Sequence, residues 1–125
     1  MTIRPKANLQ LVYVSDILRS TDFYKEIFKS APIFSSPRYV AFAADANAEA
    51  LFAIWTGGDK PDMAALRFSE IGIMLSSNEE VDRLFDEWRN KSEIIVVREP
   101  YDEVFGRTFL VKDPDGHIIR ICPRD

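Results

Sequence analysis

Apolar positions near the start of the chain first alternate and then recur at helical spacing. Val12 and Val14 alternate with their neighbours, and this period of two predicts a strand. Asp16 follows where a helix needs an N-cap. The apolar residues that then return at helical spacing are Leu18, Tyr24, Ile27 and Phe28. The pattern predicts a strand followed by an amphipathic helix that packs on a sheet.

The segment 72–89 repeats this pattern at an offset of 73 − 12 = 61 residues, because Ile73 stands where Val12 stood. Ser77 and Glu80 fit a capping box before the second helix. Three strand-like stretches follow each helix, at 31–34, 38–43 and 50–55, and at 93–97, 107–111 and 117–122. We therefore expect an α+β fold: one domain, 1–125, of two tandem βαβββ units, roughly 6–56 and 67–123, with a linker at 57–66.

The composition and charge of the chain limit the classes of partner that it can bind. The 125 residues are 46% hydrophobic and 29% charged, which is typical of a single globular domain. The net charge of −4 argues against nucleic acid or an anionic membrane as a partner. The start of the chain has no signal-peptide pattern and there is a single cysteine, Cys122, so we expect a cytoplasmic protein without an intrachain disulfide.

The two units, with VYVSDILRSTDFY at 12–24 and DPDGHII at 113–119, resemble the vicinal oxygen chelate superfamily, the glyoxalase/bleomycin-resistance/dioxygenase group. The resemblance implies a curved mixed sheet around a ligand cavity, commonly in a homodimer. It leaves open whether the units pair within one chain or are exchanged between two. Enzymes of this group usually hold a divalent metal with His or Glu from four strands.

The four corresponding positions here are Leu9, Ala53, Glu70 and Arg120. A lone carboxylate facing a guanidinium does not hold a divalent cation, because the fixed positive charge repels the ion. We therefore expect no metal and no cofactor, and a Glu70–Arg120 ion pair instead. His117 falls in the turn before the last strand, so we interpret it as a turn residue and not a ligand.

The alternation of side chains on the same strands predicts which residues line the cavity. The strand-like stretch 107–111 and its neighbours form the rim of the cavity, where the facing of each side chain is less well defined. The predicted ligand-binding residues are Leu9, Leu11, Tyr13, Leu51, Ala53, Trp55, Glu70, Met74, Arg107, Phe109 and Arg120. Tyr39, Tyr101 and Phe105 are further rim candidates. Such a lining suits an aromatic or amphiphilic small molecule.

The leading hypothesis is a metal-free binding protein that sequesters a hydrophobic or aromatic compound, as the antibiotic-resistance branch of the resembled family does. The alternative is a lyase, isomerase or dioxygenase that uses a metal, or Glu70 as a catalytic base. A third possibility is an interaction module with a vestigial cavity.

Overall fold

The computed structural model describes residues 2–124 and divides the chain into two compact units, with the boundary between Pro61 and Asp62. This boundary falls inside the stretch 57–66. The first unit contains β1 (Leu9–Tyr13), α1 (Ile17–Phe28), β2 (Phe34–Ser35), β3 (Tyr39–Ala43) and β4 (Leu51–Trp55). The second contains β5 (Ile71–Leu75), α2 (Asn78–Trp88), β6 (Ile95–Glu103), β7 (Gly106–Lys112) and β8 (Ile118–Pro123).

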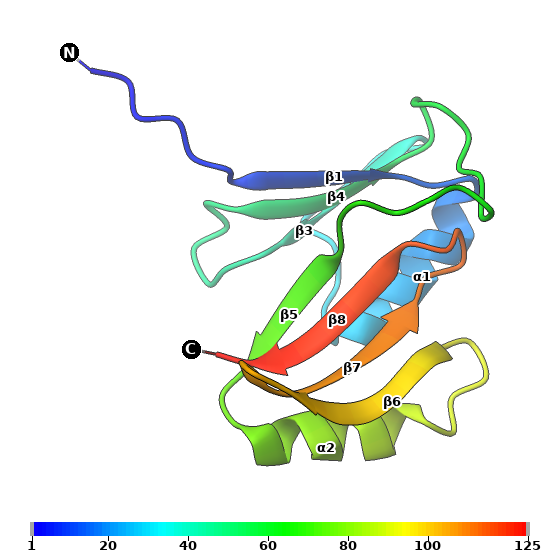
Figure 1. Ribbon diagram of the computed structural model, residues 1–125. Helices are drawn as coiled ribbons and strands as arrows, with labels where there is room; N and C mark the ends of the chain where they lie inside the picture. The colour runs from blue at the N-terminus through cyan, green and yellow to red at the C-terminus, as the bar shows by residue number, and fades with distance from the viewer. Residues whose placement is uncertain (1, 125) are drawn as a thin grey trace. The chain divides into compact units, whose positions relative to one another are not determined.

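The first unit is a four-stranded sheet in the order β1-β4-β3-β2, with α1 against one face (Figure 1). β1 and β4 are parallel, and the remaining pairs are antiparallel. Because side chains alternate across a strand, Val12, Phe52 and Ile54 share the face that packs on α1. The rings of Tyr24 and Phe52 lie with their centroids 4.8 Å apart in this core.

Helix α1 begins as predicted, because the Asp16 side chain accepts a hydrogen bond from the backbone N–H of Arg19 at 3.1 Å. The prediction is wrong for one residue of the apolar stripe, because Leu18 is 76% exposed. The buried positions are spaced as i, i+3, i+4 and i+7, and Leu18 lies off that stripe. The buried residues of α1 are Ser20, Phe23, Tyr24 and Ile27.

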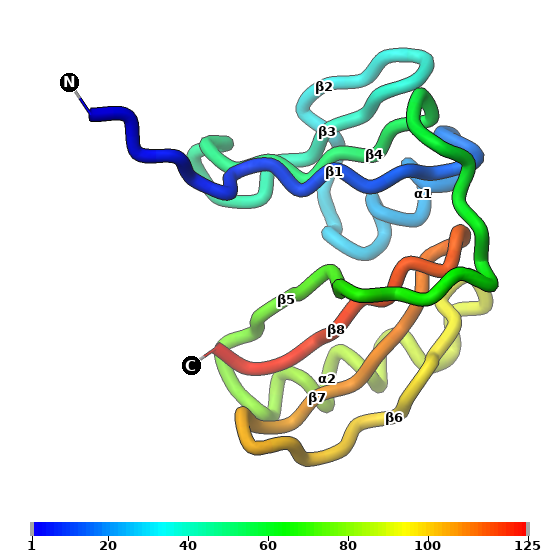
Figure 2. Tube along the Cα trace, turned by 45° about the horizontal axis from the view of Figure 1, so that its top comes forward, coloured from blue at the N-terminus to red at the C-terminus, as the bar shows by residue number. Residues whose placement is uncertain are grey.

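The second unit repeats the topology, with strand order β5-β8-β7-β6 and a parallel β5–β8 pair. Figure 2 shows the four strands side by side in this order. Ile119 and Ile121 are fully buried on the face covered by α2, as the alternation predicts. We call the opposite face of each sheet, which bears no helix of its own unit, the helix-free face.

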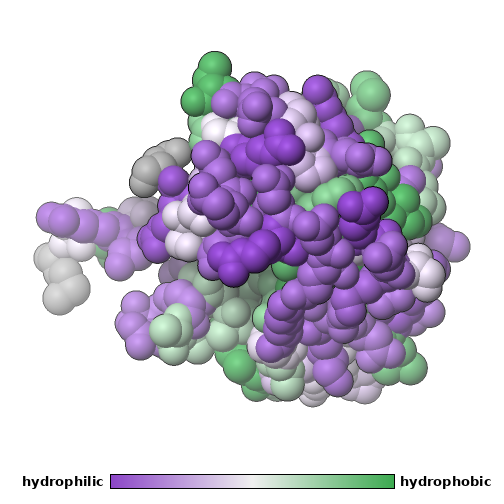
Figure 3. All heavy atoms as spheres, turned by 90° about the horizontal axis from the view of Figure 1, so that it is seen from below, coloured by the Kyte–Doolittle hydropathy of each residue, from purple (hydrophilic) through white to green (hydrophobic). Residues whose placement is uncertain are grey.

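Helix α2 carries a shifted capping box. The Ser77 side chain accepts from the Glu80 N–H at 3.2 Å, while the Glu80 carboxylate accepts from the N–H and hydroxyl of Ser76. These bonds hold the pKa of Glu80 below its usual value, with the hydroxyl bond as the largest cause. The solvent side of α2 is largely hydrophilic (Figure 3). Within residues 2–124, no helix is both long and apolar enough to cross a membrane.

Two strands differ from the prediction. β2 is only two residues long, and Pro32, which cannot donate to the ladder, lies outside it. β6 continues to Glu103 through two shifts of register, although it contains Arg98, Glu99 and Pro100. An edge strand tolerates proline and charge where an inner strand does not, and β6 is the edge of its sheet.

Candidate ligand-binding site

An ion pair lies on the helix-free face of the second unit. Arg120 on β8 donates from Nε to Glu70 Oε1 at 2.7 Å and from Nη2 to Glu70 Oε2 at 3.0 Å. Two parallel charge-assisted bonds fix the guanidinium and the carboxylate in one plane. The side chains are 22% and 39% exposed, respectively, so the pair is partly shielded from water. The predicted Glu70–Arg120 pair is therefore confirmed.

The rest of the Arg120 guanidinium is also engaged. Its Nη1 donates to the Tyr101 hydroxyl at 3.1 Å and to Thr108 Oγ1 at 3.2 Å, and its carbon lies 5.7 Å from the centre of the Phe105 ring. The bond to Glu70, followed by that to Tyr101, raises the pKa of Arg120 above its ordinary value. The residue is a permanent cation locked in position by four bonds.

These residues do not fit the divalent metal of the resembled enzymes. Leu9 and Ala53 offer no donor atoms, and both carboxylate oxygens of Glu70 already accept hydrogen bonds from Arg120. Throughout residues 2–124, no group of three or more His, Cys, Asp and Glu side chains is placed to hold a metal ion. The Glu70 carboxylate therefore serves as the ion-pair partner of Arg120.

The single histidine lies in the turn before β8. Asp113 is buried, and its carboxylate accepts from the N–H groups of Asp115 at 2.9 Å and His117 at 2.8 Å. Gly116 has φ +89°, which a residue with a side chain rarely adopts. The DPDGH sequence is thus a turn built around the Asp113 carboxylate, and the prediction of a turn position for His117 is confirmed.

The helix-free face of the first unit is aliphatic and aromatic. In register, Leu9 pairs with Leu51, Leu11 with Ala53, and Tyr13 with Trp55. All six share the predicted face, but Ala53 has no accessible surface, whereas Leu9 is 50% and Tyr13 40% exposed. The rings of Tyr13 and Trp55 meet edge to face, with centroids 5.7 Å apart.

Two glycines hold this aromatic pair in place. A Cβ on Gly57 would lie 2.3 Å from the Trp55 indole, and one on Gly58 would lie 2.6 Å from the Tyr13 ring. The stretch predicted as a linker therefore begins with a backbone surface against which both rings pack. The sequence signal was the Gly-Gly pair itself, which indicates close approach as well as flexibility.

We expect Gly57→Ala to displace the Trp55 indole, because its methyl group and the ring cannot occupy the same space. The indole lies at the end of a rotatable side chain, so the free energy of unfolding should change by less than about 1 kcal/mol. Near-ultraviolet circular dichroism should report the moved ring, and an unchanged spectrum would contradict the packing. Gly72→Ala is the matched control, because a Cβ there meets nothing within 4 Å.

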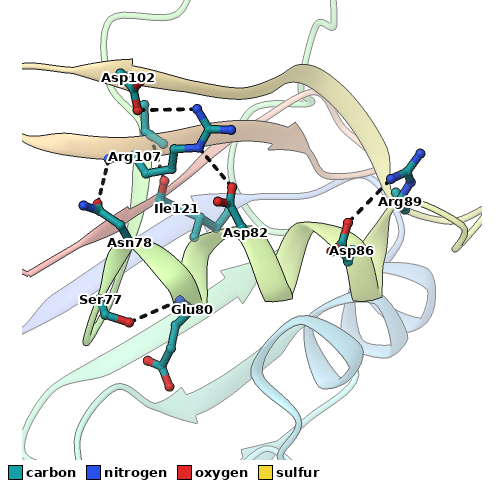
Figure 4. A network of polar contacts seen from close by, with 10 residues as sticks. Ser77, Asn78, Glu80, Asp82, Asp86, Arg89, Asp102, Arg107 and Ile121 are labelled. Atoms are coloured by element: carbon teal, nitrogen blue, oxygen red, sulfur yellow. Dashed lines mark hydrogen bonds and ion pairs between the residues drawn. The ribbon is translucent and has the colours of Figure 1, made fainter.

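The structure corrects two predicted binding residues, Phe109 and Arg107. Phe109 is fully buried against α2, with its ring centre 5.3 Å from that of Phe85. The Arg107 guanidinium donates to Asp82 on α2 at 3.0 Å and to Asp102 at 3.4 Å (Figure 4). The bond to Asp82 is the main cause that raises the pKa of Arg107.

The reason for both errors is register, because a shift of one residue transfers a side chain to the other face of a sheet. Phe109 pairs with Ile121, which faces the helix, so Thr108 and not Phe109 faces Arg120. Thr108 was missed altogether, although its place one residue before Phe109 follows once the register is known. Met74, in contrast, lies on the expected face and is 64% exposed.

Comparison with known proteins agrees with this fold. The family model described as a glyoxalase-like domain matches residues 7–124. The phenazine antibiotic resistance protein EhpR of Enterobacter agglomerans is 63% identical over 126 residues, which cover 99% of this chain and 95% of that protein.

Two solved structures share the fold at low identity. The solution structure of protein ATC0852 from Agrobacterium tumefaciens has a TM-score of 0.75 at 24% identity and covers 98% of this chain and 99% of its own. A glyoxalase-related enzyme from Fulvimarina pelagi has a TM-score of 0.72 at 21% identity, with 93% of this chain and 86% of its own covered. The predicted α+β, glyoxalase/bleomycin-resistance-like fold is confirmed, and the chain belongs to the glyoxalase-like family within the vicinal oxygen chelate superfamily.

Proposed function

We propose that the protein binds a planar aromatic antibiotic of the phenazine type and sequesters it without chemical conversion and without a resident metal. The observation that carries this proposal is the 63% identity to a phenazine antibiotic resistance protein, spread over 99% of the chain. Identity at this level, without a large insertion or a missing segment, favours a shared ligand class.

The side chains of the helix-free faces support the same ligand class. Tyr13 and Trp55 present partly exposed aromatic surface in the first unit. In the second, Phe105 presents aromatic surface and Met74 presents exposed apolar surface. Flat aromatic molecules gain most from such surfaces, since ring stacking and apolar burial act together. Polarizable methionine adapts to the outline of a ligand.

We further propose that the protein acts in the cytoplasm as a homodimer. The overall net charge of −4 leaves nucleic acid and anionic membranes as poor partners.

The enzymatic alternative has less support, because the Glu70 carboxylate that would act as a base is bound at both oxygens by Arg120.

Titration of the natively purified protein with phenazine tests the proposal. Calorimetry should show saturable binding with a defined stoichiometry, and the phenazine recovered afterwards should have an unchanged mass. Absence of binding, or conversion of the phenazine, would refute sequestration. Elemental analysis of the same preparation should find no stoichiometric zinc, nickel, manganese or iron, and finding one would refute the metal-free part.

A further inference from the structure

The hydroxyl group of Tyr101 can both accept and donate a hydrogen bond. Its oxygen accepts from Arg120 Nη1 at 3.1 Å. A guanidinium has no acceptor site, so the phenolic hydrogen points to some other group. In the described part of the chain, the Tyr101 hydroxyl has no second hydrogen-bond partner.

The other groups of the cluster are committed, apart from one hydrogen of Arg120 Nη2. Thr108 Oγ1 donates to the carbonyl of Ile121 at 2.7 Å and accepts from Arg120, so its hydrogen is used. Both hydrogens of Arg120 Nη1 go to Tyr101 and Thr108, while Nε and one hydrogen of Nη2 go to Glu70. Of the two hydroxyls, Tyr101 alone keeps a donor for a bound molecule.

The position and strength of this donor are fixed by two arginines. The guanidinium of Arg98 lies over the Tyr101 ring, 3.5 Å from its centre, and restricts the ring's orientation. Donation from Arg120 to the phenolic oxygen withdraws electron density from it, which strengthens the O–H as a donor. The phenol is held ready for an acceptor before any ligand arrives.

Charge in the cluster disfavours an anion as that acceptor. The positive charge of Arg120 is matched by the carboxylate of Glu70 at 2.7 Å, and Glu70 is the more exposed member of the pair. A second carboxylate brought to this place meets the like charge of Glu70, while the charge of Arg98 lies over the face of the Tyr101 ring. An uncharged acceptor is not repelled by the Glu70 carboxylate and can accept the phenolic hydrogen of Tyr101.

We propose that Tyr101 determines the ligand specificity of this site by donating its hydroxyl hydrogen to an uncharged acceptor, such as a ring nitrogen or carbonyl oxygen, on a planar aromatic ligand. The inference rests on the proposed function and adds to it the polar atom that the ligand must carry. It predicts discrimination between molecules of the same shape that differ only in that atom.

Phenazine and anthracene are such a pair, because the two ring nitrogens of uncharged phenazine replace C–H groups of anthracene. The wild-type protein should bind phenazine about two to ten times more tightly than anthracene, the range expected of one neutral hydrogen bond. Tyr101→Phe should abolish that ratio by weakening phenazine alone. Phenazine-1-carboxylate should bind the wild type no more tightly than phenazine does.

Anisotropy titrations in matched solvent measure both ligands, and the wild-type ratio tests the donor even if the variant folds poorly. Equal wild-type affinities, or a Tyr101→Phe variant that loses the same factor for both ligands, would overturn the role of Tyr101 while leaving aromatic binding intact. Tighter wild-type binding of the carboxylate would overturn the preference for an uncharged acceptor. If the wild type binds neither phenazine nor anthracene, the proposed function fails as well.

Discussion

Replacing Phe109 by alanine is expected to destabilise the protein by about 3–5 kcal/mol, the usual cost of removing a buried phenylalanine side chain. Phe109 is inaccessible to solvent and contacts Phe85 and Trp88, with its ring centre 5.3 and 5.9 Å from theirs. A small domain has only about 5–15 kcal/mol of stability in total. Urea unfolding at equilibrium should therefore show a much lower midpoint.

Phe105→Ala is the matched control, since the same ring is removed from an exposed turn two residues beyond β6. It should change the free energy of unfolding by less than about 1 kcal/mol. A Phe109→Ala protein with wild-type stability and weakened phenazine binding would contradict the core position and restore the interpretation of Phe109 as a ligand contact.

Replacing Trp55 by alanine should weaken phenazine binding by about 5-fold to 150-fold, because an aromatic stacking contact contributes about 1–3 kcal/mol. The indole is partly exposed on the helix-free face and is positioned by Tyr13 and Gly57. Stability should fall much less than for Phe109→Ala, because the lost surface is not fully buried. Calorimetric titration measures the affinity and urea unfolding the stability.

Leu18→Ala serves as the control for Trp55→Ala. Leu18 is 76% exposed on α1, the opposite side of the first unit's sheet from Trp55, so its removal should leave phenazine affinity within about twofold. Equal losses in the two variants would indicate a general effect on the fold. Unchanged affinity in Trp55→Ala would show that the aromatic pair is not part of the site.

Local periodicity was sufficient for the helices and strands, while the family resemblance was needed for the Glu70–Arg120 pair. The alternation around Val12 and Ile73, with the constant offset between them, predicted both βαβββ units. The resemblance to the vicinal oxygen chelate superfamily singled out Glu70 and Arg120 as two of its four ligand positions, and the ion pair expected between them is present. These predictions succeeded because the position of a residue along a strand or helix determines which face of that element its side chain occupies.

The sequence was insufficient where the face of the sheet that a side chain occupies depends on pairing with a strand remote in the sequence. The register of β7 is set by its pairing with β8 and by two irregularities in β6, which no local pattern contains. Phe109 and Arg107 were therefore assigned to the wrong face. The Gly57-Gly58 pair was ambiguous for a different reason, because the space that excludes a Cβ is created by rings on other residues.

The position of β8 between β5 and β7 has a consequence for biosynthesis. The first unit possesses its inner strand β4 once Trp55 has been made, so its sheet can close while later residues are still being added. In the second unit the corresponding inner strand, β8, likewise comes last. A nascent chain that has just passed Lys112 thus carries two strands, β5 and β7, that both lack the same neighbour. Unpaired strand edges invite association between chains, so the growing polypeptide is exposed to such association until β8 has been made.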